Sequence, residues 1–426
     1  MLRLYNTLLL PLRWSARLWA WRTGRIPGRE REVGERLARE LPPEKPGAIW
    51  IHGASVGESR IVDSLVRELR RRAIDRPLVV SAVTPTGRRQ LPAPPDVDHA
   101  FHAPLDFAGL PSRVIRALRP SALAIVETEL WPNLLHEAAL SGLPVGVVNG
   151  RLSPSRMHRY RRFAGLYRPL LSRLTLVGAQ SDEDGARFLE LGVTSRSLRV
   201  TGNVKYDLEP PEVDVDALRE RLGLPPNRPV FVAGSTHDGE EEPVLDAFLR
   251  ARGPVPSLLL VLAPRHPERA DDVEGRIRRR GLTVARLGGA TGPRGDRDVL
   301  LVDTLGQLGR LYGLAATAFV GGSLVPTGGH NVLEPAALGV PVLFGPHTQD
   351  FAEPARALAR AGGGFRVTNA DALQRELVSL LTDLERRKKA SERARGMVEA
   401  NRGALGRSVD LLLSLLEPPL RGERRP

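Results

Sequence analysis

The stretch WIHGASVGES, residues 50–59, decides the fold of the first half of the chain. The apolar run that leads into it, from Ala48 to His52, is typical of a buried strand. After it, apolar residues recur at the spacing of an amphipathic helix: Ile61, Val62, Leu65, Val66 and Leu69. Glu58 is therefore expected on the first turn of a helix, at the carboxyl end of a strand. A doubly wound α/β domain places its chemistry at that position.

Strand-like and helical segments alternate along the rest of the chain in two series. The first series contains GAIWIH, PLVVSAV, ALAIVET, PVGVVNG and LTLVGAQ, and the second contains PVFVAG, SLLLVLAP, VLLVDT, TAFVGG and PVLFG. Such alternation predicts parallel sheets with right-handed crossovers. We therefore predict an α/β protein with two Rossmann-like, doubly wound domains that face each other across a cleft, where ligands bind.

The domain boundaries follow from changes in composition. A Pro- and acid-rich stretch, YDLEPPEVDVDA, separates the two series, and the pattern after Ala370 is helical to about Leu416. The predicted organisation is a basic and apolar segment over 1–40, a first domain over 47–206, a linker over 207–217, a second domain over 218–405, and a C-terminal helix and tail over 406–426.

Composition limits the classes of partner. The chain has 426 residues, no cysteine and a net charge of +13. The lack of cysteine excludes disulfides and thiolate zinc sites. The positive charge favours a polyanion, which could be nucleic acid, an anionic membrane surface or a phosphorylated substrate, although a genomic composition bias would give the same excess. Nucleic-acid binding requires a basic stripe with interleaved aromatic residues, and aromatics make up only 5% of this chain.

The N-terminal segment, MLRLYNTLLLPLRWSARLWAWR, is apolar but interrupted by Pro11, Arg13 and Arg17. It contains no uncharged run long enough to span a membrane. Trp14, Leu18 and Trp21 share one helical stripe. Tryptophan beside arginine favours the lipid headgroup boundary, so we expect this segment to lie on a membrane. The alternative is a helix that packs on the protein's own surface.

Polar and glycine-rich clusters follow several predicted strands. Two glycine-rich loops, AGSTHDGEEE and GGSLVPTGGHNVLEP, lie on either side of APRHPER in the second domain. Glycine allows a ligand to approach the backbone closely, and free N–H groups at a helix start bind phosphate. We therefore expect a nucleotide-phosphate site here. Glu334 is expected four residues into the last of these helices, where it could accept hydrogen bonds from a ribose diol or simply favour the helix N-terminus.

The sequence offers only weak metal sites. His330 and Glu334 form an i, i+4 pair without a third ligand nearby. Asp214 and Asp216 lie in the linker, where Asp216 is expected to cap the next helix. The acids of DRD, Asp296 and Asp298, are expected to face solvent. We predict no catalytic metal and no other cofactor.

These motifs together resemble those of the bacterial transferases of 3-deoxy-D-manno-octulosonic acid (Kdo). The resemblance rests, in order along most of the chain, on WIHGASVGES, TPTG, PLD, ETELWPNLL, NGRLS, GNVKYD, AGSTHDGEE, LAPRHPER and GGHNVLEPAALGVPVLFGPH. It implies a GT-B fold, CMP-Kdo as the donor, a bis-phosphorylated acylated glucosamine disaccharide (a lipid A precursor) as the acceptor, and inversion at the anomeric carbon. It also implies peripheral attachment to the cytoplasmic face of the inner membrane. The number of Kdo residues added and the oligomeric state are not implied.

The resemblance also implies residue roles. Glu58 matches the family's acid and would be the general base, kept ionised by its helix N-terminus. The expected donor-binding residues are Lys205, Gly234, Ser235, Arg265, Gly328, Gly329, Asn331 and Glu334. The expected acceptor-side candidates are Ser55, Thr84, Thr86, Glu127 and Glu129.

Two departures and two alternatives accompany this interpretation. Gly53 stands where a β-carbon is usual in the family, and Asp350 stands where asparagine is expected. A sugar epimerase or another lipopolysaccharide glycosyltransferase of the same fold would share the second domain's loops, but not ETELWPN together with GASVGE. A polyanion-binding protein without activity is the other alternative.

Overall fold

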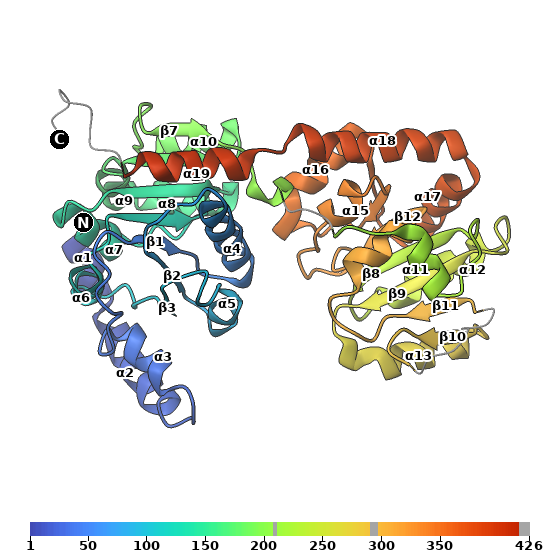
Figure 1. The fold of residues 1–426 in the computed structure, drawn as a ribbon, viewed down its shortest axis with the longest axis horizontal. Helices are drawn as coiled ribbons and strands as arrows, with labels where there is room; N and C mark the ends of the chain where they lie inside the picture. The colour runs from blue at the N-terminus through green and yellow to red at the C-terminus, as the bar shows by residue number, and fades with distance from the viewer. Residues whose placement is uncertain (208–210, 290–296, 417–426) are drawn as a thin grey trace. The chain divides into compact units, whose positions relative to one another are not determined.

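The computed structural model describes residues 1–207, 211–289 and 297–416 (Figure 1). The chain divides into two compact units. The first runs over Met1–Leu208 and takes up the chain again from Arg402, and the second is Glu209–Asn401. Each unit is built around one parallel sheet of seven strands, so the α/β class and the two Rossmann-like halves are confirmed.

The sheet of the first unit has the strand order β3-β2-β1-β4-β5-β6-β7. Its strands are β1 (Ile49–His52), β2 (Leu78–Ala82), β3 (His99–His102), β4 (Ala122–Val126), β5 (Val145–Gly150), β6 (Leu176–Ala179) and β7 (Leu198–Val200). Every neighbouring pair is parallel, with Ile49 opposite Ala122 where β1 meets β4. The strand order reverses between β1 and β4, which is the topological switch point of the sheet. The carboxyl ends of these two strands are therefore the expected ligand site.

Helices cover both faces of this sheet. They are α4 (Val56–Arg71), α5 (Pro85–Gln90), α6 (Leu110–Leu118), α7 (Pro132–Leu140), α8 (Pro154–Arg162), α9 (Ala164–Leu171), α10 (Asp182–Glu190) and the short η1 (Val204–Asp207). One apolar core joins Trp50 and Phe101 of the sheet to α6, α7 and α9. The other joins Ile49 and Ile51 to the Leu65–Leu69 side of α4, as the helical spacing predicts.

The N-terminal segment forms α1 (Leu2–Leu8), α2 (Leu10–Thr23) and α3 (Glu30–Arg36). In Figure 1, α2 and α3 lie together beyond the β3 edge of their sheet. Tyr5 on α1 donates a hydrogen bond of 3.1 Å to the Asp106 carboxylate, which also caps the start of α7. The segment expected over 1–40 therefore packs on the first unit through α1 and α3.

The sheet of the second unit has the strand order β10-β11-β9-β8-β12-β13-β14. Its strands are β8 (Val230–Thr236), β9 (Leu259–Pro264), β10 (Val284–Arg286), β11 (Val299–Leu301), β12 (Thr317–Val320), β13 (Val342–Phe344) and β14 (Gly364–Arg366). The reversal lies between β8 and β12, so the ends of these strands form the second candidate site.

The helices of this unit are α11 (Val215–Arg221), α12 (Glu241–Ala251), α13 (Ala270–Arg279), α14 (Leu308–Leu311), α15 (Leu333–Ala337), α16 (Ala352–Ala361), α17 (Ala370–Thr382) and α18 (Leu384–Ala400), with η2 (Pro267–Arg269), η3 (Tyr312–Leu314) and η4 (Gln349–Phe351) between them. The linker expected over 207–217 ends inside α11, and its residues 208–210 lie outside the described residues. Asp214 caps α11 by accepting a hydrogen bond of 3.0 Å from the N–H of Ala217, so the prediction that Asp216 is the cap is wrong.

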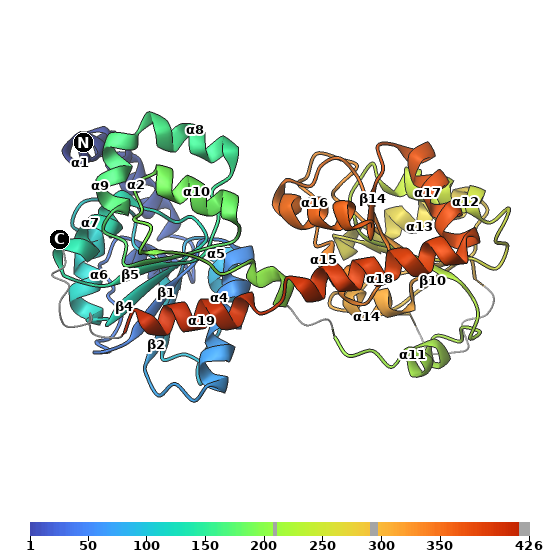
Figure 2. The same cartoon turned by 90° about the horizontal axis from the view of Figure 1, so that it is seen from above.

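The last described helix, α19 (Ala404–Ser414), belongs to the first unit, where it lies beside α4 (Figure 2). Its buried face, including Val409 and Leu412, completes the core under α4. The Asp207 carboxylate accepts hydrogen bonds from the backbone N–H groups of Gly403 and Leu405, at 2.5 and 2.6 Å. The chain thus leaves and re-enters the first unit at adjoining points, four residues before the boundary expected after residue 405. The tail over 417–426 lies outside the described residues.

Candidate active site

Glu58 lies on the first turn of α4, as the sequence predicts, and its carboxylate is fixed there by a capping box. Ser55 is the N-cap, and its Oγ accepts a hydrogen bond of 3.4 Å from the N–H of Glu58. In return, Glu58 Oε2 accepts hydrogen bonds from the N–H groups of Ala54 and Ser55, the latter at 3.2 Å. One carboxylate oxygen is thus committed to the loop. For Oε1, the described residues provide no such partner.

The carboxyl of Glu58 is not held ionised by the helix start, so that expectation is wrong. Burial raises its pKa to about 7, and the nearby charges of Glu129 and Glu127 act in the same direction. The two backbone N–H groups lower the pKa but do not offset these effects. Glu58 is only 7% exposed, which explains the weight of desolvation. A carboxyl with a pKa near 7 can accept a proton efficiently at neutral pH.

Glu127 and Glu129 follow β4, the strand beside β1, and bring two more carboxylates to the same edge. Glu127 has a left-handed backbone (φ 60°), and its Oε1 lies 3.4 Å from Lys205 Nζ. Glu129 Oε2 accepts a hydrogen bond of 2.9 Å from Trp131 Nε1, and burial raises the pKa of Glu129. Lys205, expected on the donor side, therefore belongs to the first unit's acidic cluster, on η1.

The remaining acceptor-side candidates, Thr84 and Thr86, lie at the start of α5, which packs against the loop before Glu58. Thr84 is the N-cap of α5, and its Oγ1 lies 3.1 Å from the carbonyl oxygen of Ala54 and 3.0 Å from the N–H of Gly87. A β-carbon at Gly87 would approach that same carbonyl to 3.0 Å, so α5 packs directly on the Glu58 loop. Thr86 is exposed, with its hydroxyl 3.3 Å from that of Thr84. Gly53, the family departure, leaves room for Glu58, whose Cβ would lie 3.1 Å from a β-carbon there.

A buried histidine behind this loop was not identified from the sequence. His52 ends β1 with no exposed surface, and its Nδ1 lies 2.9 Å from the Ser81 hydroxyl. Trp50 Nε1 donates to the same hydroxyl at 2.8 Å, so Ser81 links the two rings, and His52 Nε2 has no hydrogen-bond partner among the described residues. The ring meets Trp131 edge-on at 5.4 Å, and Trp131 holds Glu129. Burial lowers the pKa of His52 to about 4, so the ring is neutral.

In the second unit, one carboxylate joins the two glycine-rich loops. Glu240, which is fully buried, accepts hydrogen bonds from four backbone N–H groups: His237 at 2.9 Å, Gly322 at 2.6 Å, Ser323 at 2.9 Å and Leu324 at 2.8 Å. The acid-rich run after AGSTH indicates that a carboxylate lies near this loop. It does not indicate which of the acids turns inward. The loops after β8 and β12 are thereby fixed to each other.

Gly234 and Ser235 end β8 where the backbone is crowded. Ser235 has a left-handed backbone (φ 56°), and a β-carbon at Gly234 would lie 2.2 Å from the buried Tyr312 hydroxyl. A β-carbon at Gly321, on the loop after β12, would lie 2.4 Å from the carbonyl oxygen of Ser235. Gly234 and Gly321 are therefore required for the close approach of the two strand ends, independently of any contact with a ligand.

Gly328 and Gly329 have positive φ angles of 105° and 78°. The N–H of Gly329 donates to the Gly322 carbonyl at 2.7 Å, which closes the loop after β12. Asp350, the second family departure, donates its N–H to the Gly328 carbonyl at 2.9 Å. A β-carbon at Gly328 would lie 2.6 Å from the Asp350 carboxylate. Asp350, where asparagine is expected in the family, thus lies directly against Gly328, one of the residues predicted to bind the sugar donor.

Three histidines and an arginine gather beside these loops, and only Arg265 was predicted as a site residue. His237 Nε2 and His330 Nε2 are 2.8 Å apart with nearly parallel rings, and His266 meets His237 edge-on at 5.7 Å. Burial is the largest of the causes that lower the pKa of His330 to about 4. The charges of His237, Arg265 and His266 act in the same direction. His237 and His330 are therefore neutral at pH 7, one donating to the other, while the exposed Arg265 carries the charge.

Asn331 and Glu334 lie together at the end of the same loop. Asn331 Nδ2 donates to Glu334 Oε1 at 3.2 Å, and Asn331 Oδ1 accepts from the N–H of Leu333 at 3.1 Å. Glu334 is the second residue of α15, so the expectation that it lies four residues into the helix is wrong. The pair is half-buried and can present hydrogen-bonding groups to a nucleotide.

Within residues 1–207, 211–289 and 297–416, no group of three or more His, Asp or Glu side chains is arranged to hold a metal ion. Asp214 caps α11, and the Asp298 carboxylate accepts hydrogen bonds from Thr283 and pairs with Arg252. Asp296 lies outside the described residues.

The fold is that of the GT-B class. A glycosyltransferase from Rickettsia africae superimposes with a TM-score of 0.56 over 87% of this chain and 98% of its own, at 14% identity. A UDP-GlcNAc 2-epimerase from Neisseria meningitidis, bound to UDP-GlcNAc, gives 0.59 over 86% and 100%, also at 14% identity. The fold alone therefore does not separate transferases from epimerases.

The family follows from sequence. Residues 31–208 match the profile described as 3-deoxy-D-manno-octulosonic-acid transferase (kdotransferase). A 3-deoxy-D-manno-octulosonic acid transferase of Haemophilus influenzae is 38% identical over 382 residues, 88% of each chain. One of Bordetella pertussis is 35% identical over 425 residues, 95% of this chain and 96% of its own. The chain belongs to the 3-deoxy-D-manno-octulosonic-acid transferase family, and the resemblance seen in its motifs is confirmed.

Proposed function

We propose that the protein transfers Kdo from CMP-Kdo to a phosphorylated lipid A precursor, with inversion, in lipopolysaccharide biosynthesis. Family membership supports the transferred sugar, and the observation that carries the mechanism is the position and pKa of Glu58. A direct displacement with inversion requires one base to take the proton of the attacking hydroxyl. Glu58 is fixed at the sheet's switch point with one carboxylate oxygen outside the capping box.

Glu127, Glu129 and Lys205 set the electrostatics around this base. The two glutamates raise its pKa, and Lys205 compensates part of their charge through Glu127. A bound acceptor hydroxyl would donate its proton to Glu58 as the new bond forms. Lys205 also has the charge to hold the donor's carboxylate or phosphate.

The second unit provides the groups expected to bind CMP. Negative charge develops on the phosphate of the leaving CMP, and the side chain of Arg265 with the backbone at Gly234, Ser235 and Gly328 would stabilise it. Gly329, whose N–H donates to the Gly322 carbonyl, would keep that loop closed. Asn331 and Glu334 offer hydrogen bonds to the nucleoside. The neutral His237–His330 pair adds a donor beside Arg265 without adding charge.

A donor screen tests this proposal. CMP-Kdo, UDP-sugars and ADP-sugars would each be offered with a tetraacyl glucosamine disaccharide bisphosphate, and the lipid product followed by mass spectrometry. We expect a product that carries Kdo from CMP-Kdo alone. Epimerisation of a UDP-sugar without transfer would favour the alternative that the fold shares.

We further propose that the enzyme attaches to the inner membrane from the cytoplasmic side, through α2. The described helices include none long and apolar enough to cross a membrane. The predicted stripe is exposed, with Trp14 at 71% and both Leu18 and Trp21 at 55%. Such a surface suits insertion into the headgroup region of a bilayer.

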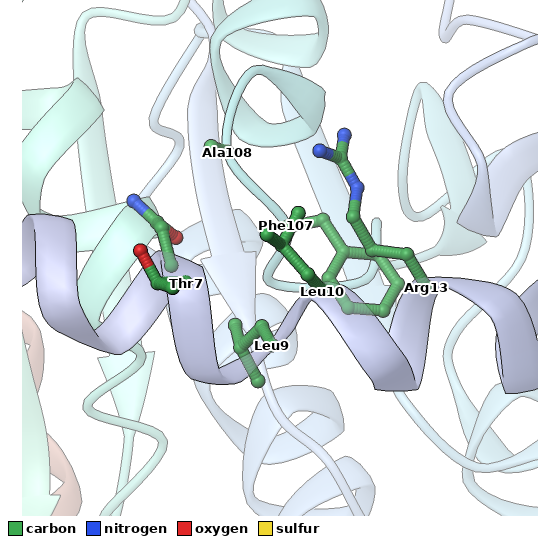
Figure 3. Close-up of a pocket in the computed structure, with 7 residues that line it drawn as sticks. Thr7, Leu9, Leu10, Arg13, Phe107 and Ala108 are labelled. Atoms are coloured by element: carbon green, nitrogen blue, oxygen red, sulfur yellow. The ribbon is translucent and has the colours of Figure 1, made fainter.

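A small hollow of about 170 Å³ lies where α1 meets α2. Figure 3 shows Leu10 and Arg13 of α2 beside Phe107, which follows the half-buried Asp106. The Arg13 guanidinium lies 5.7 Å from the centre of the Phe107 ring. An acyl chain of the acceptor or of a membrane lipid could lie against this apolar floor with Arg13 at its polar end.

A further inference from the structure

A pocket of about 560 Å³ lies on the first unit between α3, α5 and the edge strand β3, outside the residues assigned above. Four arginines and two glutamates line it: Arg29, Arg31, Arg88, Arg89, Glu32 and Glu35. Its ionised lining therefore carries two more positive than negative charges. A pocket of this size can hold a phosphorylated sugar.

Both glutamates are already neutralised by residues of α3 and its start. Glu32 accepts from Arg29 Nη2 at 2.7 Å and from Arg36 Nε at 3.1 Å. Glu35 accepts from Arg31 Nε at 2.7 Å, and its other oxygen accepts the backbone N–H of His102 at 2.8 Å. The carboxylates hold the wall of the pocket in place, and they have little capacity left to neutralise α5.

The two arginines on α5 are not ion-paired within the described residues, and the Glu35 carboxylate acts on Arg88 only at a distance. Arg88 donates through Nη2 to the carbonyl of Ala100 at 2.6 Å, which aligns its guanidinium along the pocket wall. Burial lowers the pKa of Arg88, which shows that its charge is partly removed from water. Arg89 is exposed, and neither arginine forms an ion pair with a described residue. Two guanidinium groups that line one pocket and form no ion pair in the described part of the chain suit a phosphate dianion, which each can bind with two hydrogen bonds.

The position of the pocket indicates which phosphate it binds. The same short helix, α5, contributes Arg88 and Arg89 to the pocket and packs Gly87 on the Ala54 carbonyl beside the Glu58 loop. On the other side, α3 joins the pocket to α2, since the Arg36 guanidinium lies 5.6 Å from the centre of the Trp19 ring. The pocket thus lies between the exposed apolar helix and the candidate base.

We infer that this pocket binds one phosphate monoester of the acceptor's headgroup and so positions the acceptor hydroxyl at Glu58. The inference rests on the proposed function, because the phosphorylated acceptor comes from it. Arg88 and Arg89 act as positioning residues and take no part in proton transfer.

The test compares Arg89→Gln and Arg88→Gln with wild type in detergent, where no bilayer contributes. The acceptors are the tetraacyl disaccharide bisphosphate and its two monophosphate forms. With the bisphosphate, we expect each substitution to raise the KM for the acceptor roughly 10- to 100-fold, as for the loss of a charged hydrogen bond, while the KM for CMP-Kdo stays unchanged. The effect should vanish with the monophosphate that lacks the bound group. Arg89→Gln is informative even if Arg88→Gln fails to fold, because Arg89 is exposed.

Arg76→Gln is the matched control, since it removes the same charge from an exposed residue just before the amino end of β2, whereas α5 follows the carboxyl end of that strand. Binding to phosphatidylglycerol vesicles without acceptor should be equal for all variants. Unchanged acceptor KM in both pocket variants would overturn the inference, and so would loss of vesicle binding alone, which would assign the pocket to bilayer lipid. If wild type itself transfers no Kdo, it is the proposed function that fails.

Discussion

Replacing Glu58 by glutamine should stabilise the first unit at alkaline pH. The ordinary pKa of this carboxyl is 4.5, and the fold raises it to about 7. The folded state therefore binds a proton more tightly than the unfolded state, and stability falls as the pH rises from 4.5 through 7. Ionised Glu58 then costs about 3 kcal/mol above pH 7, since each tenfold change in an equilibrium constant corresponds to about 1.4 kcal/mol.

The glutamine amide can keep the capping geometry, because its oxygen can still accept from the N–H groups of Ala54 and Ser55. Glu58→Gln should thus match wild type near pH 5 and exceed it by up to about 3 kcal/mol near pH 8. Part of the gain comes from relief of Glu127 and Glu129, whose charges repel Glu58.

Urea unfolding followed by tryptophan fluorescence measures this in the full-length protein. All five tryptophans lie at or before residue 131, in the first unit, so the signal reports that unit alone. The free energy of unfolding of each variant would be compared with wild type at pH 5, 6, 7 and 8.

The control is Glu68→Gln, the same substitution on the same helix. Hydrogen bonds from Arg71, then Arg72, hold the pKa of Glu68 at about 2. Its stabilising effect is present above the unfolded pKa and is lost only as the pH falls toward 2, so Glu68→Gln should be destabilising by a constant amount between pH 5 and 8. A pH-independent difference between Glu58→Gln and wild type would refute the raised pKa of Glu58.

Three further outcomes are expected. Transfer of Kdo should continue in EDTA, because no ion is required for the proposed displacement; activity that collapses and returns with Mg²⁺ would contradict this. Trp14→Glu with Trp21→Glu should release the enzyme from anionic vesicles and leave turnover of a detergent-dispersed acceptor intact, and unchanged flotation would argue against α2 as the attachment site. Glu240→Ala should release the loops after β8 and β12, because four N–H groups, two of them buried, lose their acceptor; hydrogen exchange at Gly322–Leu324 should accelerate and CMP-Kdo affinity should fall, whereas retained protection would show that the loops hold without it.

The interior of both sheets was predictable from sequence, and their edges were not. The apolar runs before Gly53 and Gly234 are buried on both faces of a parallel sheet, so they read as continuous hydrophobic segments. The four missed strands, β3, β7, β10 and β14, are the outermost strands of the two sheets. Three of them span only three residues each and are partly exposed, and β3 contains two histidines, so their sequences lack that signal.

The positions of the candidate site residues were predictable, but their chemistry was not. The strand and helix around Glu58 place it at the switch point, yet its pKa depends on its burial in the fold and then on Glu129 and Glu127, about 70 residues away. Glu240 resembles its acidic neighbours in sequence, and only the fold turns it inward onto the loop after β12. The pairing of His237 with His330 likewise joins residues from two loops that are brought together by β8 and β12.

The most direct test of the central claim is single-turnover transfer of Kdo from CMP-Kdo to the lipid A precursor by wild type and Glu58→Gln, with CMP-Kdo affinity measured on the same preparations. Wild-type rates should rise with pH and level off above about 7, as Glu58 loses its proton. Glu58→Gln should bind CMP-Kdo as wild type does but transfer roughly 10²–10⁴-fold more slowly, without that rise. A variant that transfers at near wild-type rate would show that Glu58 caps α4 and does not act as the base.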